Sequence, residues 1–322
     1  MEKFYNHKLI INKEQNQLRL DQALTKISNF TRSQIKILIL NGNVKKNEQI
    51  ITEASYRVKI GEEYILNITV SGEEKFEAED IPLDIFFEDN DIIIINKFAG
   101  IVTHPAPGNN SGTLVNALLN HSKNNLSNIN DNNRPGIVHR LDKETSGLMV
   151  IAKNNEAHLK LAEQFKDHSI SRKYKAIVWG IPNNQMIEGY IERHKVNRKK
   201  MSLNKNEKGK YSKTNIKLIS SYEIASLVEC SLETGRTHQV RLHMTSINSP
   251  LVGDKVYGKS KINQFGKDKD TFNKFLILKN FSRHALHAYH LGFNHPKSKK
   301  YIEFTNEIPT DMQNLINLII KY

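Results

Sequence analysis

The chain of 322 residues has little of three things: cysteine, long apolar runs and acidic charge. Its one cysteine, Cys230, has no partner for an internal disulfide and lies in an apolar stretch typical of a strand in a reducing compartment. The longest unbroken apolar run extends only from Leu148 to Ala152, far short of the ~20 residues of a membrane-spanning helix. The N-terminal residues contain no apolar core of signal-peptide length. We therefore expect a cytoplasmic protein without membrane association.

The scarcity of acidic residues leaves a surplus of positive charge. Lys and Arg number 47 against 34 Asp and Glu, which gives a formal net charge of +13. Such a surplus favours a polyanionic partner, because phosphate contacts dominate the affinity of proteins for nucleic acids. Composition alone leaves a second interpretation open, that of a soluble protein that is merely basic. The hydrophobic fraction of 38% is sufficient for a packed core, which argues against wholesale disorder.

The apolar pattern divides the chain into a small N-terminal domain and a large domain. Residues 15–72 combine two short amphipathic helices with short strands, which predicts a small α/β domain, and the charged stretch 73–84 is predicted to be a linker. From residue 85 to 322, strands and helices mix without a regular βα alternation. This arrangement favours an α+β fold over a doubly wound sheet.

The densest group of polar residues lies in the segment 134–153. A turn at Pro135 enters this segment and a strand leaves it through Gly147, so the loop between them is fixed at both ends. The loop carries Asp142 between two cations, and catalytic groups are often placed on loops held in this way. From local chemistry alone a second interpretation is favoured, in which Asp142 accepts hydrogen bonds from nearby N–H groups and stabilises a turn.

Residues 134–153 resemble the signature segment of the large-subunit ribosomal pseudouridine synthases, the family that includes the synthases A, C and D. Other stretches resemble further motifs of that family in the expected order: 96–105, 172–176, 234–258 and 286–296. Phe98 departs from the first motif, where the family usually has proline. The resemblance spans about residues 85–305. It implies the pseudouridine synthase fold, with a mixed, mostly antiparallel central sheet, and an enzyme that isomerises uridines in RNA.

Carried over position by position, the resemblance implies roles for four residues. Asp142 would be the nucleophile, Tyr174 the ring that packs against the target base, and Arg241 the ion-pair partner of Asp142. Arg140 would help to displace the base from its helix. Tyr174 and Arg140 each have a plainer interpretation, as a core aromatic residue and as a surface cation.

The isomerisation suits these residue types. It breaks the bond between N1 of the base and C1′ of the ribose, turns the base, and joins C5 to C1′. Because it needs no redox change, water or metal, we expect no cofactor. Asp142 could attack C1′, attack C6 of the ring, or remove a ribose proton, and the sequence leaves these routes open.

Two basic regions are candidates for contact with RNA. The segment 193–213 carries nine cations against one acid, so it is either a solvated loop or an arm that grips phosphates. The two N-terminal helices resemble the alpha-L RNA-binding motif of ribosomal proteins, and a basic cap that stabilises the main domain is the alternative. Besides Arg140, the residues expected to contact RNA are Arg198, Lys199, Lys200, Arg236, Lys26, Arg32, Lys36, Lys45 and Lys46.

Two other classes of protein compete with this interpretation. A zinc hydrolase is considered because the chain has 13 histidines, with His284, His287 and His290 spaced by three. No H-E-x-x-H site or cysteine pair accompanies them, so structural histidines and no metal are expected. The other class is a non-catalytic RNA-binding assembly factor, against which the intact catalytic set argues. With its basic N-terminal unit, the chain resembles synthases C and D more than A, which lacks that unit. This resemblance implies large-subunit ribosomal RNA or a precursor subunit as the partner. We expect the protein to be a monomer.

Overall fold

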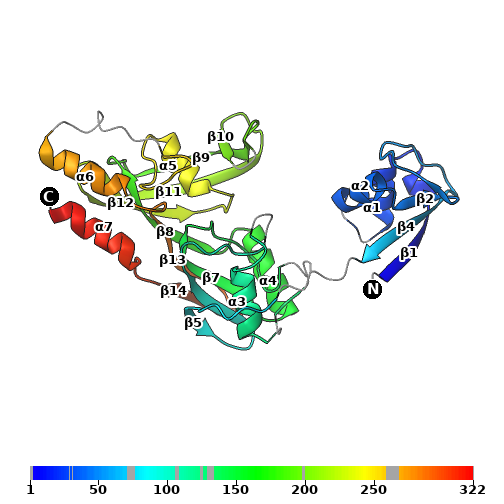
Figure 1. The fold of residues 1–322 in the computed structure, drawn as a ribbon, viewed down its shortest axis with the longest axis horizontal. Helices are drawn as coiled ribbons and strands as arrows, with labels where there is room; N and C mark the ends of the chain where they lie inside the picture. The colour runs from blue at the N-terminus through cyan, green and yellow to red at the C-terminus, as the bar shows by residue number, and fades with distance from the viewer. Residues whose placement is uncertain are drawn as a thin grey trace. The chain divides into compact units, whose positions relative to one another are not determined.

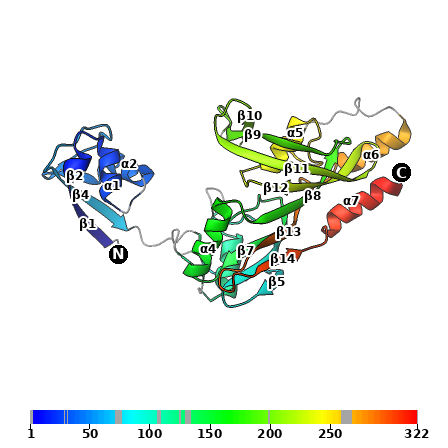
Figure 2. The same ribbon diagram turned by 180° about the vertical axis from the view of Figure 1, so that it is seen from behind.

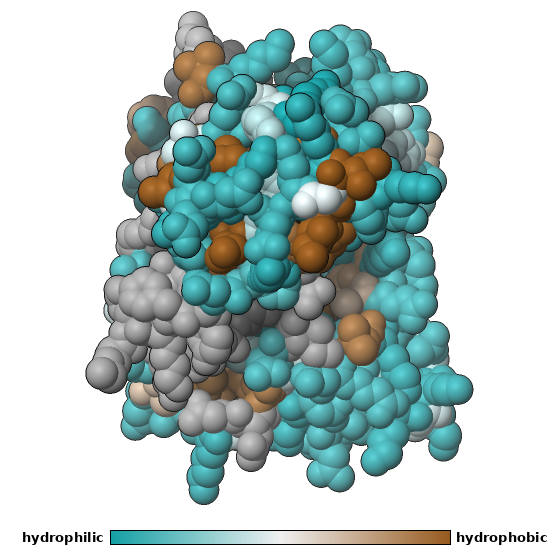
Figure 3. All heavy atoms as spheres, turned by 90° about the vertical axis from the view of Figure 1, so that its right-hand side faces the viewer, coloured by the Kyte–Doolittle hydropathy of each residue, from teal (hydrophilic) through white to brown (hydrophobic). Residues whose placement is uncertain are grey.

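The computed structural model describes residues 3–28, 30, 32–70, 77–105, 109–123, 126–128, 134–197, 200–258 and 268–321. The chain forms two compact units, Met1–Lys75 and Phe76–Tyr322, and Figures 1 and 2 show both from opposite sides. In these described ranges, no helix combines the length and apolar character needed to cross a membrane. On the face seen in Figure 3, hydrophilic side chains dominate and hydrophobic ones gather in separate patches.

The small unit is built on a four-stranded antiparallel sheet. In spatial order its strands are β1 (Lys3–Ile10), β4 (Glu63–Val70), β2 (Val44–Lys46) and β3 (Gln49–Ile50). Strand β1 pairs with β4 along its whole length. The unit therefore includes a strand that lies before residue 15, where the sequence led us to place its start.

Two helices pack on this sheet, α1 (Leu20–Ile27) and α2 (Arg32–Leu40). Leu20 and Leu24, one helical turn apart, are fully buried in the same core as Ile35 and Ile39 of α2 and Tyr64 of β4. The spacing of these apolar residues is what predicted the helix pair, and the pair is present.

The large unit is built on one sheet of ten strands. Along the sheet the strands are β10 (Met201–Asn204), β9 (Gln185–Arg193), β11 (Lys210–Ser221), β12 (Ala225–Leu232), β8 (Ser171–Trp179), β13 (Leu286–Asn294), β7 (Ser146–Ala152), β6 (Ile92–Lys97) and β5 (Ile85–Glu88), and β14 (Tyr301–Thr305) pairs with β13. Among the described residues β13 and β7 are the one parallel pair of strands. The expected α+β class with a mixed, mostly antiparallel sheet is thus confirmed.

Helices cover both faces of this sheet, so its central strands are buried on both sides (Figures 1 and 2). The helices are α3 (Leu114–His121), α4 (Asn155–Lys166), α5 (Gln239–Ser246), α6 (Lys269–Lys279) and α7 (Thr310–Lys321). In β6, Ile93 and Ile95 pack in one core with α3, and Ile92 and Ile94 pack in another with α4. This explains why the first four residues of β6, 92–95, are all isoleucine.

Strand β8 shows the same alternation and brings it to the site. Ala176 and Val178 pack with residues of α5, while Ile177 and Trp179 pack with residues of α6 and α7. Because successive side chains of a strand point to opposite faces, Tyr174 lies on the α5 side.

In the large unit, five elements escaped prediction: β5, β9, β10, α6 and β13. The segment 193–213 is not a plain loop, because it contains β10, which pairs with β9, and the start of β11. Its many exposed polar side chains hide the two-residue period that marks a half-buried strand. Arg198 and Lys199 lie outside the described residues, and Lys200 directly precedes β10.

Candidate active site

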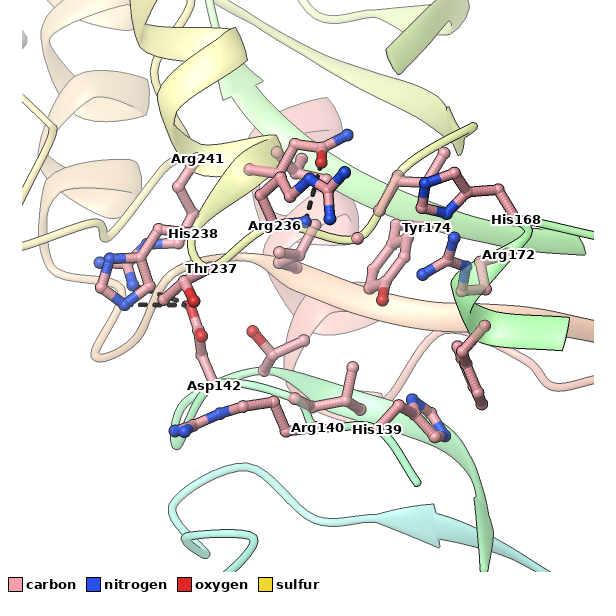
Figure 4. A pocket seen from close by; sticks show the side chains of 18 of the residues that line it. His139, Arg140, Asp142, His168, Arg172, Tyr174, Arg236, Thr237, His238 and Arg241 are labelled. Carbon is pink, nitrogen blue, oxygen red and sulfur yellow. Dashed lines mark hydrogen bonds and ion pairs between the residues drawn. The ribbon is translucent and has the colours of Figure 1, made fainter. Parts of the chain in front are cut away.

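A pocket of about 260 Å³ lies where the loop before β7 meets β8 and the start of α5 (Figure 4). This volume is close to the lower end of the ~300–1,000 Å³ common for ligand sites. Asp142, Tyr174 and Arg241 all line the pocket, although three separate segments of the chain carry them. The fold therefore brings together the three residues expected to be catalytic.

Asp142 forms an ion pair with Arg241. Nη1 of Arg241 donates to Oδ2 of Asp142 at 2.9 Å, while its Nε and Nη2 donate to the two carboxylate oxygens of Asp254 at 2.7 and 3.0 Å. The side chains of Arg241 and Asp254 are 7% and 1% exposed, whereas that of Asp142 is 19% exposed. Asp254 thus fixes the plane of the guanidinium, and Asp142 remains open to the pocket.

Hydrogen bonds keep Arg241 and Asp254 charged although both are buried. Burial alone would lower the pKa of Arg241, but hydrogen bonds to Asp254 and then Asp142 outweigh burial and raise it. Burial alone would raise the pKa of Asp254, but the hydrogen bonds from Arg241 and from two backbone N–H groups lower it. Both buried groups therefore stay charged at neutral pH. The sequence assigned Asp254 no role, because its contact with Arg241 depends on the tertiary fold.

His238 is a second neighbour of Asp142. It precedes α5 in a left-handed conformation, with a φ of 58°, and its Nε2 lies 3.7 Å from Oδ2 of Asp142. Its Nδ1 shares a hydrogen bond of 2.8 Å with the hydroxyl of Tyr257, which also accepts the N–H of Met201 at 2.8 Å. Burial lowers the pKa of His238, so its ring is neutral at pH 7. These bonds connect the basic segment 193–213 to the pocket.

A buried lysine anchors the loop that carries Asp142. Nζ of Lys97 donates to three backbone carbonyls, those of Phe98 (2.8 Å), Ile101 (3.0 Å) and Lys143 (3.2 Å). The hydroxyl of Thr103 adds a hydrogen bond to the carbonyl of Leu141 at 3.0 Å. The backbone is therefore held on both sides of Asp142. Burial lowers the pKa of Lys97 to about 7.

Tyr174 serves both the core and the pocket. Its half-buried ring packs beside two hydrophobic clusters of the large unit and also forms part of the pocket wall (Figure 4). Burial raises the pKa of its phenol, so the side chain is neutral. A neutral aromatic face at this place is suited to contact with a pyrimidine ring.

The rest of the pocket wall is basic. Arg140 is exposed at the pocket, and Arg236, whose Nε donates to the carbonyl of Tyr211 at 2.8 Å, lines the pocket as well. Among the described residues that line it, Asp142 is the sole acid, and it is already paired. A basic wall around one paired carboxylate favours an anionic ligand.

The spaced histidines make separate hydrogen bonds and share no site. Each bonds a hydroxyl of a neighbouring strand or loop: His284 with Thr145 (2.7 Å), His287 with Ser146 (2.9 Å) and His290 with Ser171 (3.1 Å). They therefore tie the start of β13 to the segments around Asp142 and Tyr174.

One other group in the described part of the chain has the composition of a metal site: Asp89, Asp91 and His295. Its ligand atoms already have protein partners, since Nε2 of His295 bonds Oδ2 of Asp89 at 2.8 Å and the Asn154 amide donates to Asp91 at 2.8 Å. These hydrogen bonds join the turn before β6 to the segments that follow β7 and β13, and they account for this group.

The cations of the small unit fall into two kinds. Lys26 and Lys36 are exposed, and Lys45 is half-buried in β2. Arg32 donates to Asp21 at 2.9 Å, and Lys46 bonds Glu62 at 2.5 Å and the hydroxyl of Tyr56 at 2.7 Å. Arg32 and Lys46 thus have a structural function within this unit that their sequence positions did not indicate.

Replacing Lys97 by Met should flatten the pH dependence of stability. The pKa of Lys97 is about 7 when folded and near the ordinary 10.5 when unfolded, so the unfolded chain binds more protons between these values and stability rises with pH. We expect the free energy of unfolding to rise more steeply with pH in the wild type than in Lys97→Met, by up to ~1.4 kcal/mol per pH unit. Urea unfolding at pH 7, 8 and 9, followed by the fluorescence of Trp179, measures the two slopes.

The exposed neighbour Lys143 supplies the matched control, because Lys143→Met removes a charge from the same loop without removing a buried one. That variant should keep the wild-type slope. If the free energy of unfolding rose equally with pH in the wild type and in Lys97→Met, the lowered pKa of Lys97 would be contradicted.

Comparison with known proteins agrees with this geometry. The RNA pseudouridylate synthase family matches residues 91–246, and the S4 domain family matches residues 18–63. The chain is 45% identical over 305 residues to the ribosomal large subunit pseudouridine synthase D of Zymomonas mobilis, covering 94% of each protein. It is 40% identical over 309 residues to the Escherichia coli protein of the same name, covering 95% of this chain and 92% of that one.

Among solved structures, the human RNA pseudouridylate synthase domain containing 4 protein has a similar fold, with a TM-score of 0.55 at 22% identity over 74% of this chain and 93% of that one. The sequence relatives cover nearly the whole chain, and the pocket unites the residues that the resemblance singled out. The chain is therefore a member of the RNA pseudouridine synthase family and carries an N-terminal S4 domain.

Proposed function

We propose that the protein isomerises specific uridines to pseudouridine in large-subunit ribosomal RNA, with Asp142 as the reacting carboxylate. The observation that carries this proposal is the partly exposed carboxylate of Asp142, held by the buried Arg241 in an otherwise basic pocket. The names of the Zymomonas mobilis and Escherichia coli relatives support the choice of RNA. A pure assembly factor would have no need to hold a carboxylate where RNA phosphates approach.

The residues divide the work between chemistry and positioning. The carboxylate of Asp142 acts on the nucleotide by one of three routes, attack at C1′, attack at C6 or removal of a ribose proton. Arg241 orients that carboxylate, and Tyr174 packs against the base, a contact worth ~1–3 kcal/mol for an aromatic ring and a base. The N1–C1′ bond breaks, the base turns, and the C5–C1′ bond forms, while C5 loses its hydrogen and N1 gains a proton.

The small unit and the basic hairpin around β10 would hold the RNA outside the pocket. Lys26, Lys36 and Lys45 lie on the small unit, and Lys200 lies next to the strand that Tyr257 connects to the pocket. Arg32, Lys46, Arg198 and Lys199 complete this outer set of proposed RNA contacts, and Arg236 would contact RNA from the pocket wall. We further propose that the protein acts as a monomer.

Release of tritium from RNA labelled at C5 of uridine tests the reaction, because bonding C5 to the ribose expels that hydrogen. We expect release by the wild type and a fall of at least ~10³-fold for Asp142→Asn, since a neutral amide replaces the reacting carboxylate. Tyr174→Leu should also lose turnover. Glu144→Gln removes a nearby acid that does not line the pocket and should retain activity.

Binding of large-subunit RNA without release by the wild type, after other RNAs have been tried, would favour the assembly-factor alternative. Equal release by the wild type and Asp142→Asn would remove Asp142 from the chemistry and leave the reaction standing.

Arg140 is proposed to occupy the space that the target base leaves in its stack. It is exposed and lies at the pocket next to the loop of Asp142 (Figure 4). Extrusion of a paired base costs a few kcal/mol, whereas an unpaired base pays little of this cost. Arg140→Ala should therefore lower turnover roughly tenfold or more on a base-paired target and much less on a single-stranded one. Equal losses on both RNAs would contradict this function.

A further inference from the structure

Arg172 carries a buried guanidinium with one unsatisfied edge. This residue of β8 is 8% exposed and lines the pocket near Tyr174. Its Nε and Nη2 are buried and make no hydrogen bond to any described residue. The guanidinium carbon lies 5.6 Å from the centre of the Phe165 ring, and that ring stacks on His139 at 4.6 Å. Aromatic packing thus supports the guanidinium and leaves its polar edge without a partner.

This edge is the one through which arginine grips an anion side-on, because Nε–H and Nη2–H point in the same direction. In two other buried arginines of the large unit it is occupied. Arg241 uses Nε and Nη2 to bind Asp254, and Arg283 uses them to bind Asp311 at 2.7 and 2.9 Å. A buried ion without a partner is strongly unfavourable. The edge of Arg172 is therefore an anion site built into the fold but not filled by a described side chain.

The charged side chain next to Arg172 in the pocket wall is a second cation, Arg236. His168 and Arg236 line the pocket together with Arg172, and both also line an adjoining hollow. The electrostatic neighbours of Arg172 in the described structure are Tyr174 and Arg236, with no acid among them. Gly235 lies close by, and a Cβ there would come within 2.3 Å of Nη1, so glycine leaves room for the guanidinium where it is.

The chemistry of the edge favours a phosphate over a base. A uracil carbonyl is neutral and offers one oxygen, whereas a phosphodiester offers two unesterified oxygens and a negative charge. Figure 4 shows Tyr174 between Asp142 and Arg172. An anion held at Arg172 would therefore lie across the proposed base contact from the reacting carboxylate.

We propose that the Nε–Nη2 edge of Arg172 binds two oxygens of a backbone phosphate next to the target uridine. This inference rests on the proposed function for the identity of the substrate as RNA. The bound phosphate fixes the position of the ribose, and with it C1′ and its protons, relative to Asp142. Positioning of this kind matters because a displacement of about 1 Å is enough to cost ~100-fold in rate.

A cycle that combines protein and RNA substitutions tests the contact. Binding is measured by fluorescence anisotropy in the Asp142→Asn background, with Arg172 present or replaced by Gln. The RNAs carry a single uncharged methylphosphonate at each phosphate that flanks the target. At one position the methylphosphonate should weaken binding to the Arg172 protein by about tenfold or more, and should have little further effect with Arg172→Gln.

Lys173→Gln is the matched control, because it removes the same charge from the neighbouring residue, which points to the opposite face of β8. It should keep the full methylphosphonate effect. Equal losses with Arg172 and Arg172→Gln at every position would overturn the proposal. Without RNA, Arg172→Gln should melt at the wild-type temperature or above, because it removes a charge that has no partner. A fall in the melting temperature of about 5 °C or more would assign Arg172 a structural role instead.

Measuring tritium release by the wild type on the same RNAs distinguishes a failure of the phosphate site from a failure of the isomerase function. If the wild type releases tritium but the effects of Arg172→Gln and of the methylphosphonates on binding are independent, the phosphate site is overturned and the isomerase function stands. If the two effects on binding depend on each other but the wild type releases tritium from no RNA, phosphate binding by Arg172 is supported and the isomerase function is overturned.

Discussion

Arg241 lies buried between two carboxylates, and the pocket is organised around this shared cation. Two donors on one edge bind Asp254, which two backbone N–H groups also hold, and the remaining Nη1 reaches Asp142. Removal of one member of a buried ion pair commonly costs ~3–5 kcal/mol. The group therefore joins α5, the loop after it and the loop before β7, and it determines where the carboxylate of Asp142 points.

The sheet supplies the other wall of the pocket through simple alternation. Side chains of β8 that face α5 include Tyr174 and Arg172, while the intervening residues pack on the opposite side. Histidines at the start of β13 bond the hydroxyls of Thr145 and Ser146 and so fix the end of the loop that carries Asp142. Regular secondary structure thus holds a short irregular loop, which is how scaffolds usually present reacting groups.

The sequence pattern predicted the α+β class and the helix pair of the small unit, and the family resemblance implied that Asp142, Tyr174 and Arg241 share one site. The sequence could do so because apolar spacing reports local structure and the motifs lie in continuous stretches. It did not predict the function of Asp254 or the free edge of Arg172, since both depend on which distant side chains approach. Lys46 illustrates the same limit: its partner Glu62 lies 16 residues away, so the sequence did not indicate their ion pair within the small unit.

Asp254 holds Arg241 against Asp142, and we therefore expect Asp254 to support the reaction without touching the RNA. The most direct test measures tritium release for Arg241→Gln, Asp254→Asn and the double variant. Asp254→Asn should lower turnover by roughly ten- to a hundredfold when Arg241 is present and should add little when Arg241 is already replaced, because the two residues act as one unit. If the losses of turnover from Arg241→Gln and Asp254→Asn multiply in the double variant, the two residues act separately and Asp254 does not work through Arg241.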